Sequence, residues 1–321
     1  MRRGIAAAVA AACALVPATA HAGTAYVAND LDDTVSVIDT DSNTVVGQPI
    51  EVGKGPRAVT ATPNGKRVFV ANRGGDSVSA INTQTQDQIG KTIKVGKQPR
   101  GIVASPDNKR VYSANRISDS VSVINVKKRK VIDKVPVGNR PHGITITPNG
   151  KRVYVADNDD EAVSVIKTNN NQVVGSQIPV GGGPEGMTTT PDGFVYVANF
   201  FDGTVSVIDS GSNSVATTID PAGPGNTGIA ASPTDPLVYT ADEGGGTVTV
   251  IDTDTNTVVD PPIDVGSVPV AVAFAPNGTR AYTANKGGDD VSVINTATST
   301  VVDTVPVGDT PRGVAVISQD P

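Results

Sequence analysis

The tetrapeptide Tyr26-Val27-Ala28-Asn29 recurs six more times along the chain, at intervals of 42 or 43 residues. The later copies begin at Phe69, Tyr112, Tyr154, Tyr196, Tyr239 and Tyr282. All six tyrosines of the protein therefore occupy one repeat position, and Phe69 fills the seventh. A repeat of this length in a strand-rich sequence is typical of a β-propeller with one blade per repeat. The sequence predicts an all-β, seven-bladed propeller.

The second repeat indicates how each blade is built. Its strand candidates are 57–62, 67–72, 77–82 and 92–95, which are rich in Val, Ile and Thr and are separated by polar turns. The first candidate contains the small residues Ala58 and Ala61, which suit a strand close to a crowded axis. We therefore predict four-stranded blades whose first strand is the innermost.

The two ends of the repeat array predict how the ring closes. After the leader the chain starts on a second strand, at Tyr26, and it ends on a first strand at 312–317. Each strand type reaches seven copies only if the C-terminal strand joins the three N-terminal strands in one shared blade. Such a closure removes the open blade that a linear array would leave. We expect residues 23–321 to form one monomeric domain.

Residues 1–22 read as a signal peptide. Arg2-Arg3 precede an Ala-rich apolar run, and Ala20-His21-Ala22 is a small-x-small cleavage site. A lipoprotein signal ending at Cys13 is the alternative. The sequence thus predicts export to an extracellular, periplasmic or cell-surface location. No later apolar run approaches the length needed to span a membrane.

The net charge of −6 conceals an asymmetry between the two halves of the ring. Residues 23–167 carry 21 Lys/Arg and 15 Asp/Glu, whereas residues 168–321 carry 3 and 17. One arc of the ring should therefore be basic and the other acidic. This difference is either drift among solvated loop residues or a dipole that orients a partner.

Several repeat motifs resemble a known family. Besides Tyr-Val-Ala-Asn, the chain contains Thr-Val-Ser-Val-Ile-Asp at 34–39 and 204–209 and Thr-Pro-Asn-Gly-Lys-Arg-Val at 62–68 and 147–153. These motifs resemble the YVTN-family β-propeller repeat over the whole predicted mature chain. The resemblance implies an exported propeller, similar in fold to lactonase-like and haem d1-type propellers. Those catalytic relatives depend mainly on histidines, and this mature chain has only His142. We therefore expect no haem, copper or other cofactor.

The start of each first strand should place one side chain at the channel mouth. Around the ring these residues are Arg312, Arg57, Arg100, His142, Glu185, Thr227 and Val270. Four consecutive positions can be cationic, and convergent guanidinium groups suit a carboxylate or a phosphate. The sequence therefore predicts an anion site formed by Arg57, Arg100, His142, Glu185 and Arg312. The alternative is that each arginine pairs with a loop carboxylate such as Asp76 or Asp119.

Three other surface features are weaker candidates. Phe200 and Phe201 are the only aromatic residues placed in a loop, and they could stack on a sugar or anchor a protein. The opposite face carries the basic run Lys127–Arg129, which could attract a nucleic acid or another polyanion or could simply be solvated. The acidic stretch with Asp157, Asp159 and Glu161 is the densest candidate for a loosely bound divalent cation.

These observations leave three hypotheses for the function. The first is a secreted or cell-envelope binding scaffold without catalysis, whose partner is a protein, a glycan or an anionic small molecule. The second is a lactonase-like hydrolase or lyase that uses His142, Glu185 and the arginine cluster, and it requires His142 to be free of a carboxylate. The third is a structural component of a surface layer.

Overall fold

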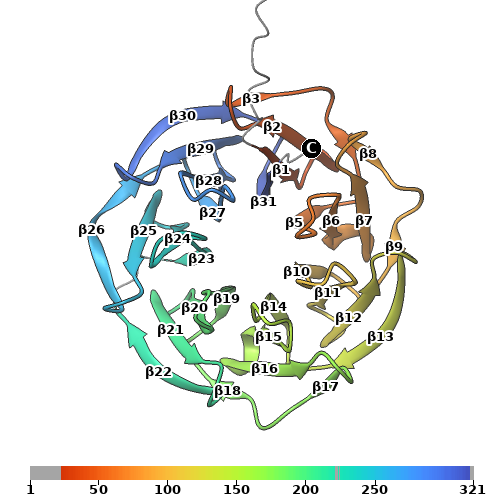
Figure 1. Ribbon diagram of the computed structural model, residues 1–321, viewed down its shortest axis with the longest axis vertical. Helices are drawn as coiled ribbons and strands as arrows, with labels where there is room; N and C mark the ends of the chain where they lie inside the picture. The colour runs from red at the N-terminus through yellow and green to blue at the C-terminus, as the bar shows by residue number, and fades with distance from the viewer. Residues whose placement is uncertain (1–22, 221–222, 224, 319–321) are drawn as a thin grey trace, which may run out of the picture.

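The computed structural model describes residues 23–220, 223 and 225–318. The predicted signal peptide lies outside these residues. Seven antiparallel sheets stand side by side around a central channel (Figure 1). We number them as blades 1 to 7, beginning with the blade that contains Tyr26. The prediction of a seven-bladed propeller with four-stranded blades is confirmed.

Each blade contains one strand of each of four types, ordered from the axis outward. The innermost strands, in blades 1 to 7, are β31 (Pro311–Ile317), β5 (Pro56–Ala61), β10 (Pro99–Ala104), β14 (Pro141–Ile146), β19 (Pro184–Thr189), β23 (Asn226–Ala231) and β27 (Pro269–Phe274). The second strands are β1 (Thr24–Asn29), β6 (Arg67–Asn72), β11 (Arg110–Asn115), β15 (Arg152–Asp157), β20 (Phe194–Asn199), β24 (Leu237–Asp242) and β28 (Arg280–Asn285). The third strands are β2 (Thr34–Asp39), β7 (Ser77–Asn82), β12 (Ser120–Asn125), β16 (Ala162–Lys167), β21 (Thr204–Asp209), β25 (Thr247–Asp252) and β29 (Asp290–Asn295).

The outer strand takes two forms. In blades 3, 5, 6 and 7 it is continuous, as β13 (Lys130–Pro136), β22 (Ser214–Ile219), β26 (Thr257–Asp264) and β30 (Thr300–Pro306). In blades 1, 2 and 4 it is split into β3 (Thr44–Val45) and β4 (Ile50–Glu51), β8 (Asp87–Gln88) and β9 (Ile93–Lys94), and β17 (Gln172–Val173) and β18 (Ile178–Pro179). The single outer strand predicted at 92–95 is therefore two short strands. Gly90, with φ of 60°, turns the chain between them, a conformation that glycine adopts without strain.

The C-terminal strand closes the ring as predicted. β31 pairs antiparallel with β1, with Tyr26 opposite Ala315 and Val27 opposite Val314. Figure 1 shows the two ends of the described chain meeting in this one blade. Blade 1 is thus held together by strands that lie almost 300 residues apart in sequence, and the ring has no open blade.

The repeat tyrosines hold neighbouring blades together. Tyr26 is fully buried in a cluster with Val35 and Val37 of its own blade and with Val68 and Val70 of blade 2. Equivalent clusters join the other blades, and every tyrosine and Phe69 is at most 1% exposed. Because each blade has apolar side chains on both faces, the core is distributed around the ring.

The asparagine of each repeat ties the second strand to the third. Asn29 Nδ2 donates to Thr34 Oγ1 at 3.0 Å and to Ser36 Oγ at 2.9 Å. The same arrangement recurs at Asn199, while Asp242 and Asp157 replace asparagine in two blades. These buried side chains end the second strands just below the turns that surround the channel mouth.

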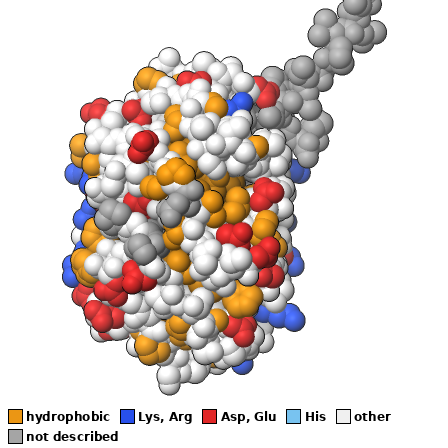
Figure 2. Space-filling view, turned by 90° about the vertical axis from the view of Figure 1, so that its left-hand side faces the viewer, with side chains coloured by type: hydrophobic (Ala, Val, Ile, Leu, Met, Phe, Trp, Pro, Cys, Tyr) orange, Lys and Arg blue, Asp and Glu red, His pale blue; other side chains and the backbone are white. Residues whose placement is uncertain are grey.

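The outer wall carries the acidic character of blades 5 to 7. Figure 2 views this side, with hydrophobic side chains along the middle of the wall and acidic side chains on either side of them. Val259 on β26 is 44% exposed. Within the described residues, no helix has the length and apolar character of a membrane span.

A candidate anion site at the channel mouth

Glycine fixes how the inner strands meet at the axis. A Cβ atom on Gly143 would lie 2.1 Å from the backbone oxygen of Glu185, and one on Gly186 would lie 2.1 Å from that of Thr227. The strands can approach this closely only because these residues have no side chain. The preceding residue of each strand lines the channel instead.

The second residues of all seven inner strands line one cavity of about 240 Å³. They are Arg57, Arg100, His142, Glu185, Thr227, Val270 and Arg312. The repeat pattern therefore identified the residues that meet at the channel mouth. Whether they bind a ligand stays a prediction.

Arg100 reaches across the mouth to Glu185. Its Nη2 lies 2.5 and 2.8 Å from the two carboxylate oxygens, and the two side chains are 16% and 18% exposed. Because the partners come from blades 3 and 5, this ion pair spans blade 4. It is a partly buried pair, so water screens it less than it would screen a surface pair.

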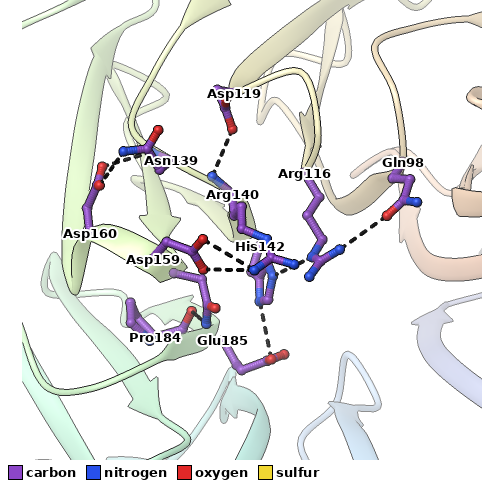
Figure 3. Close-up of polar contacts among 11 residues, drawn as sticks. Gln98, Arg116, Asp119, Asn139, Arg140, His142, Asp159, Asp160, Pro184 and Glu185 are labelled. Atoms are coloured by element: carbon purple, nitrogen blue, oxygen red, sulfur yellow. Dashed lines mark hydrogen bonds and ion pairs between the residues drawn. The ribbon is translucent and has the colours of Figure 1, made fainter.

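His142 lies between this ion pair and a further arginine. Its Nδ1 is 3.2 Å from Glu185 Oε1, and its Nε2 accepts a hydrogen bond from Arg116 Nε at 3.1 Å. Arg116 Nη1 also donates to Gln98 Oε1 at 3.3 Å. Figure 3 shows the row Gln98, Arg116, His142 and Glu185. The hydrolase hypothesis required a histidine without a carboxylate partner, and His142 has such a partner in Glu185.

Burial and charge set the protonation of this row. Burial lowers the pKa of His142, the Glu185 carboxylate opposes that effect, and nearby arginines add to it, so that the pKa is about 4. Burial alone would raise the pKa of Glu185, but the contact with His142 and the charge of Arg100 bring it to about 2. At neutral pH the histidine is therefore neutral and the glutamate is ionised.

Two further ion pairs sit at the rim. Arg312 Nε lies 3.1 Å from Asp30 Oδ2, within blade 1. Lys286 Nζ lies 3.3 Å from Glu243 Oε1, between blades 7 and 6. Arg312 thus pairs with a loop carboxylate, as the alternative predicted. Asp76 and Asp119 instead accept hydrogen bonds from the backbone NH groups of Gln98 and Arg140.

Arg57 differs from Arg100 and Arg312. Within the described part of the chain it has no hydrogen bond and no carboxylate at ion-pair distance. Burial, followed by the charges of Arg100 and Arg312, lowers its pKa to about 9. It therefore remains a cation at neutral pH, in the cavity wall between two other arginines.

Two arginines that the sequence analysis did not single out belong to the same region. Arg73 and Arg116 each follow the repeat tetrapeptide directly, and the charge of Arg73 contributes to the lowered pKa values of Arg57 and Arg100. In the described structure, Arg73 Nε is buried and has no hydrogen-bond partner. Comparing this one repeat position across blades would have revealed both residues.

The aromatic pair lies on the mouth face but outside the cavity lining. Phe200 and Phe201 contact edge to face, with ring centroids 5.5 Å apart, and Phe201 is 75% exposed. The ring of Phe201 covers Gly183, where a Cβ atom would lie 2.4 Å from it. The pair is thus a protruding apolar tip, and its role as a binding element stays a prediction.

The acidic candidates do not converge. Asp157 points into blade 4 and accepts a hydrogen bond from Ser164, while Asp159 pairs with Arg140 at 3.3 Å. Within residues 23–220, 223 and 225–318, no group of three or more His, Cys, Asp or Glu side chains could hold a metal ion. Asp157, Asp159 and Glu161 therefore do not form such a group.

The basic run lies on the other face. Lys127 and Lys128 are exposed, whereas Arg129 is half-buried and donates to the backbone oxygen of Ile89. Lys127 and Lys128 line a groove with Lys66, Arg67 and Lys109 from the turns of blades 2 and 3. Binding of a nucleic acid or another polyanion there is untested.

Comparison with known proteins adds a family. Residues 16–131 and 81–177 match the model of a family described as lactonase, 7-bladed beta-propeller. The chain belongs to this lactonase family. A search of curated proteins found no significant match.

Solved structures share the lactonase-family fold. Hydrazine synthase from Kuenenia stuttgartiensis is 23% identical over 83% of this chain and 96% of that chain, with a TM-score of 0.74. A dihydro-haem d1 dehydrogenase is 15% identical over 91% of this chain and 74% of that chain, with a TM-score of 0.68. A Bacteroides fragilis protein provisionally assigned as a 6-phosphogluconolactonase is 17% identical over 94% and 99%, with a TM-score of 0.76. At these identities the likeness concerns the fold alone.

Proposed function

We propose that this protein is an exported propeller of YVTN-type repeats whose channel mouth binds a small anionic molecule. The observation that carries the proposal is Arg57, a half-buried cation in the wall of the 240 Å³ cavity that has no described carboxylate at ion-pair distance. Leaving a buried charge unpaired is unfavourable, so the site favours a ligand that supplies the missing negative charge. The protein would act as a binding scaffold at the cell envelope or outside the cell.

The ligand group that fits is a carboxylate or a phosphate. A guanidinium offers planar paired donors to either group, and Arg100 and Arg312 flank Arg57 in the ring. The volume of the cavity, about 240 Å³, suits a small molecule or the tip of a larger one. The apolar pair Phe200 and Phe201 and the basic run Lys127–Arg129 remain separate candidates for a protein, glycan or polyanion partner.

A calorimetric screen of small carboxylates and phosphates tests this function. We expect binding that weakens as salt rises, because the interaction is an ion pair. Arg57→Gln should weaken binding by about 1.5–3 kcal/mol, the scale of a charged hydrogen bond. Lys91→Gln, an equal charge change at the circumference of blade 2, should bind as the wild type does. If no anion binds the wild type better than Arg57→Gln, the proposal is wrong.

Hydrolysis of a lactone is the second candidate function. It is favoured by the family and by the neutral imidazole of His142 inside the cavity. The contact between His142 and Glu185 counts against it, because the hypothesis required a histidine without a carboxylate partner. For His142 to accept a proton through Nε2, Arg116 must first release that atom. The likeness to a provisionally assigned 6-phosphogluconolactonase supports including acidic and phosphorylated lactones in the assay.

Titration of released acid decides between the two functions. Saturable turnover that His142→Gln abolishes, while anion binding persists, would establish the hydrolase. Binding without turnover across the lactone panel would leave the scaffold as the function.

A further inference from the structure

Blade 2 supplies two arginines to the same corner of the mouth. Arg57 is the second residue of β5, and Arg73 begins the 3₁₀ helix η1 (Arg73–Gly75) that follows β6. The backbone NH of Arg73 donates to the oxygen of Gly55 at 2.7 Å, so its backbone lies beside the entrance of β5. Both side chains therefore start from adjacent points of the rim.

These two arginines have no anionic partner among the described residues, whereas their neighbours do. Arg73 Nε is buried without an acceptor. Within the described residues, the Arg57 side chain, which lines the cavity, has no hydrogen bond and no ion pair. Arg100 is paired with Glu185 and Arg312 with Asp30. The unbalanced positive charge of the mouth is thus concentrated at blade 2.

The charge balance of this sector points the same way. Of the five arginines at positions 57, 73, 100, 116 and 312, only Arg100 and Arg312 have a carboxylate at ion-pair distance among the described residues. Among the described residues, the Arg116 side chain donates hydrogen bonds to the neutral groups of His142 and Gln98 and to no carboxylate. The rim ion pair of Lys286 with Glu243 contributes no net charge. A ligand with one negative charge would leave most of the remaining three arginines without an anionic partner.

We propose that the ligand of the channel mouth is a small dianion, a dicarboxylate or a phosphate monoester, whose two charges engage Arg57 and Arg73. This inference rests on the proposed function, that the mouth binds an anion, and adds the charge of the ligand. A second negative charge on the ligand should add much to the binding free energy, because both guanidinium groups are partly withdrawn from water. An unpaired charge is unfavourable in such surroundings.

Matched ligand pairs that differ by one charge test the inference. Succinate is compared with succinamate, and methyl phosphate with methyl sulfate, by calorimetry at pH 8 and low ionic strength. At that pH a phosphate monoester carries close to two charges, since its second pKa is about 6. We expect the dianion of at least one pair to bind about tenfold more tightly than its partner. The pair that shows the larger ratio identifies a carboxylate or a phosphate ligand.

Two variants locate the second charge. Arg73→Gln should bring the dianion-to-monoanion ratio close to one, and Arg73→Lys should restore part of it because the charge returns. Arg57→Gln should weaken both members of each pair. Lys91→Gln provides the matched change of net charge and should keep the wild-type ratio, and thermal melts establish that each variant is folded.

The possible outcomes distinguish failure of the dianion inference from failure of the proposed anion-binding function. If wild-type protein binds the two members of each pair equally, or if Arg73→Gln weakens both by the same factor, the dianion inference is wrong while the anion site stands. If the wild type binds none of the four ligands, the proposed function itself is contradicted.

Discussion

Replacing Asp242 with asparagine should stabilise the propeller at neutral pH. Asp242 is fully buried at the repeat position that asparagine occupies in five blades, and it accepts hydrogen bonds from Thr247 at 3.0 Å and Thr249 at 2.7 Å. In blade 1 the equivalent Asn29 donates to Thr34 and Ser36 in the same places. Hydroxyl groups can donate or accept, so an amide at position 242 can keep both bonds without a buried charge.

The magnitude follows from the pKa of Asp242. Burial raises that pKa from 3.8 to about 6, against the opposing effect of the threonine hydroxyls. Because the pKa is higher in the folded state, Asp242 does not destabilise the fold below its unfolded pKa of 3.8. The destabilisation grows as pH rises from there and is complete above the folded pKa of about 6. Two pKa units at 1.36 kcal/mol each give a destabilisation of about 3 kcal/mol above pH 7, which Asp242→Asn removes. At pH 5 about half of that gain should remain.

Thermal unfolding of both proteins between pH 5 and pH 8 measures this effect. For a domain of this size, 3 kcal/mol corresponds to a rise in Tm of roughly 5 °C. We expect that rise at pH 8 and a smaller one at pH 5. Asp157→Asn should gain less. Its amide oxygen must keep the bonds that Ser164 and Gln177 donate to one oxygen of Asp157, which leaves the new NH2 where Oδ1 has no partner among the described residues. Equal Tm values for wild type and Asp242→Asn at pH 8, or a shift that does not vary with pH, would refute the reasoning.

Three further predictions concern the axis and the ring closure. Gly143→Ala should lower the free energy of unfolding by about 1–3 kcal/mol or prevent folding, since its Cβ would overlap the backbone oxygen of Glu185. Gly211→Ala, in an exposed turn, should have a small effect, and chemical denaturation of both variants makes the comparison. Arg57→Gln should raise Tm without ligand while it weakens anion binding, because an unpaired, half-buried charge disappears; a lower Tm would mean that Arg57 has a structural partner. Truncation before Pro311 removes β31 and exposes the edge of β1, so a melt within a few degrees of the full chain would contradict the closure.

The fold was predictable because one physical constraint repeats seven times. A buried tyrosine or phenylalanine, flanked by small or β-branched residues and followed by a buried asparagine or aspartate, recurs in every second strand, and each copy reports the same packing between blades. The axial residues were predictable for the same reason, since one position per inner strand faces the channel. The split of the outer strand in blade 2 was missed because it depends on a single glycine, Gly90, in a variable turn.

The pairing within the site was not predictable from the repeat. Arg100 extends across blade 4 to Glu185, and Arg312 instead turns toward Asp30 of its own blade, although both occupy the same repeat position. Which carboxylate a long side chain reaches depends on its rotamer and on its neighbours around the ring. Sequence position therefore identified the members of the site but not their partners, nor that Arg57 would be left without one.

The most direct test is a crystal structure of the protein soaked in selenate, a dianion whose selenium atom is located by anomalous scattering. The account predicts an anomalous peak at the channel mouth, with selenate oxygens within hydrogen-bond distance of the guanidinium groups of Arg57 and Arg73, and the loss of that peak in Arg57→Gln. An empty mouth in which Arg57 pairs with a protein carboxylate would contradict the account.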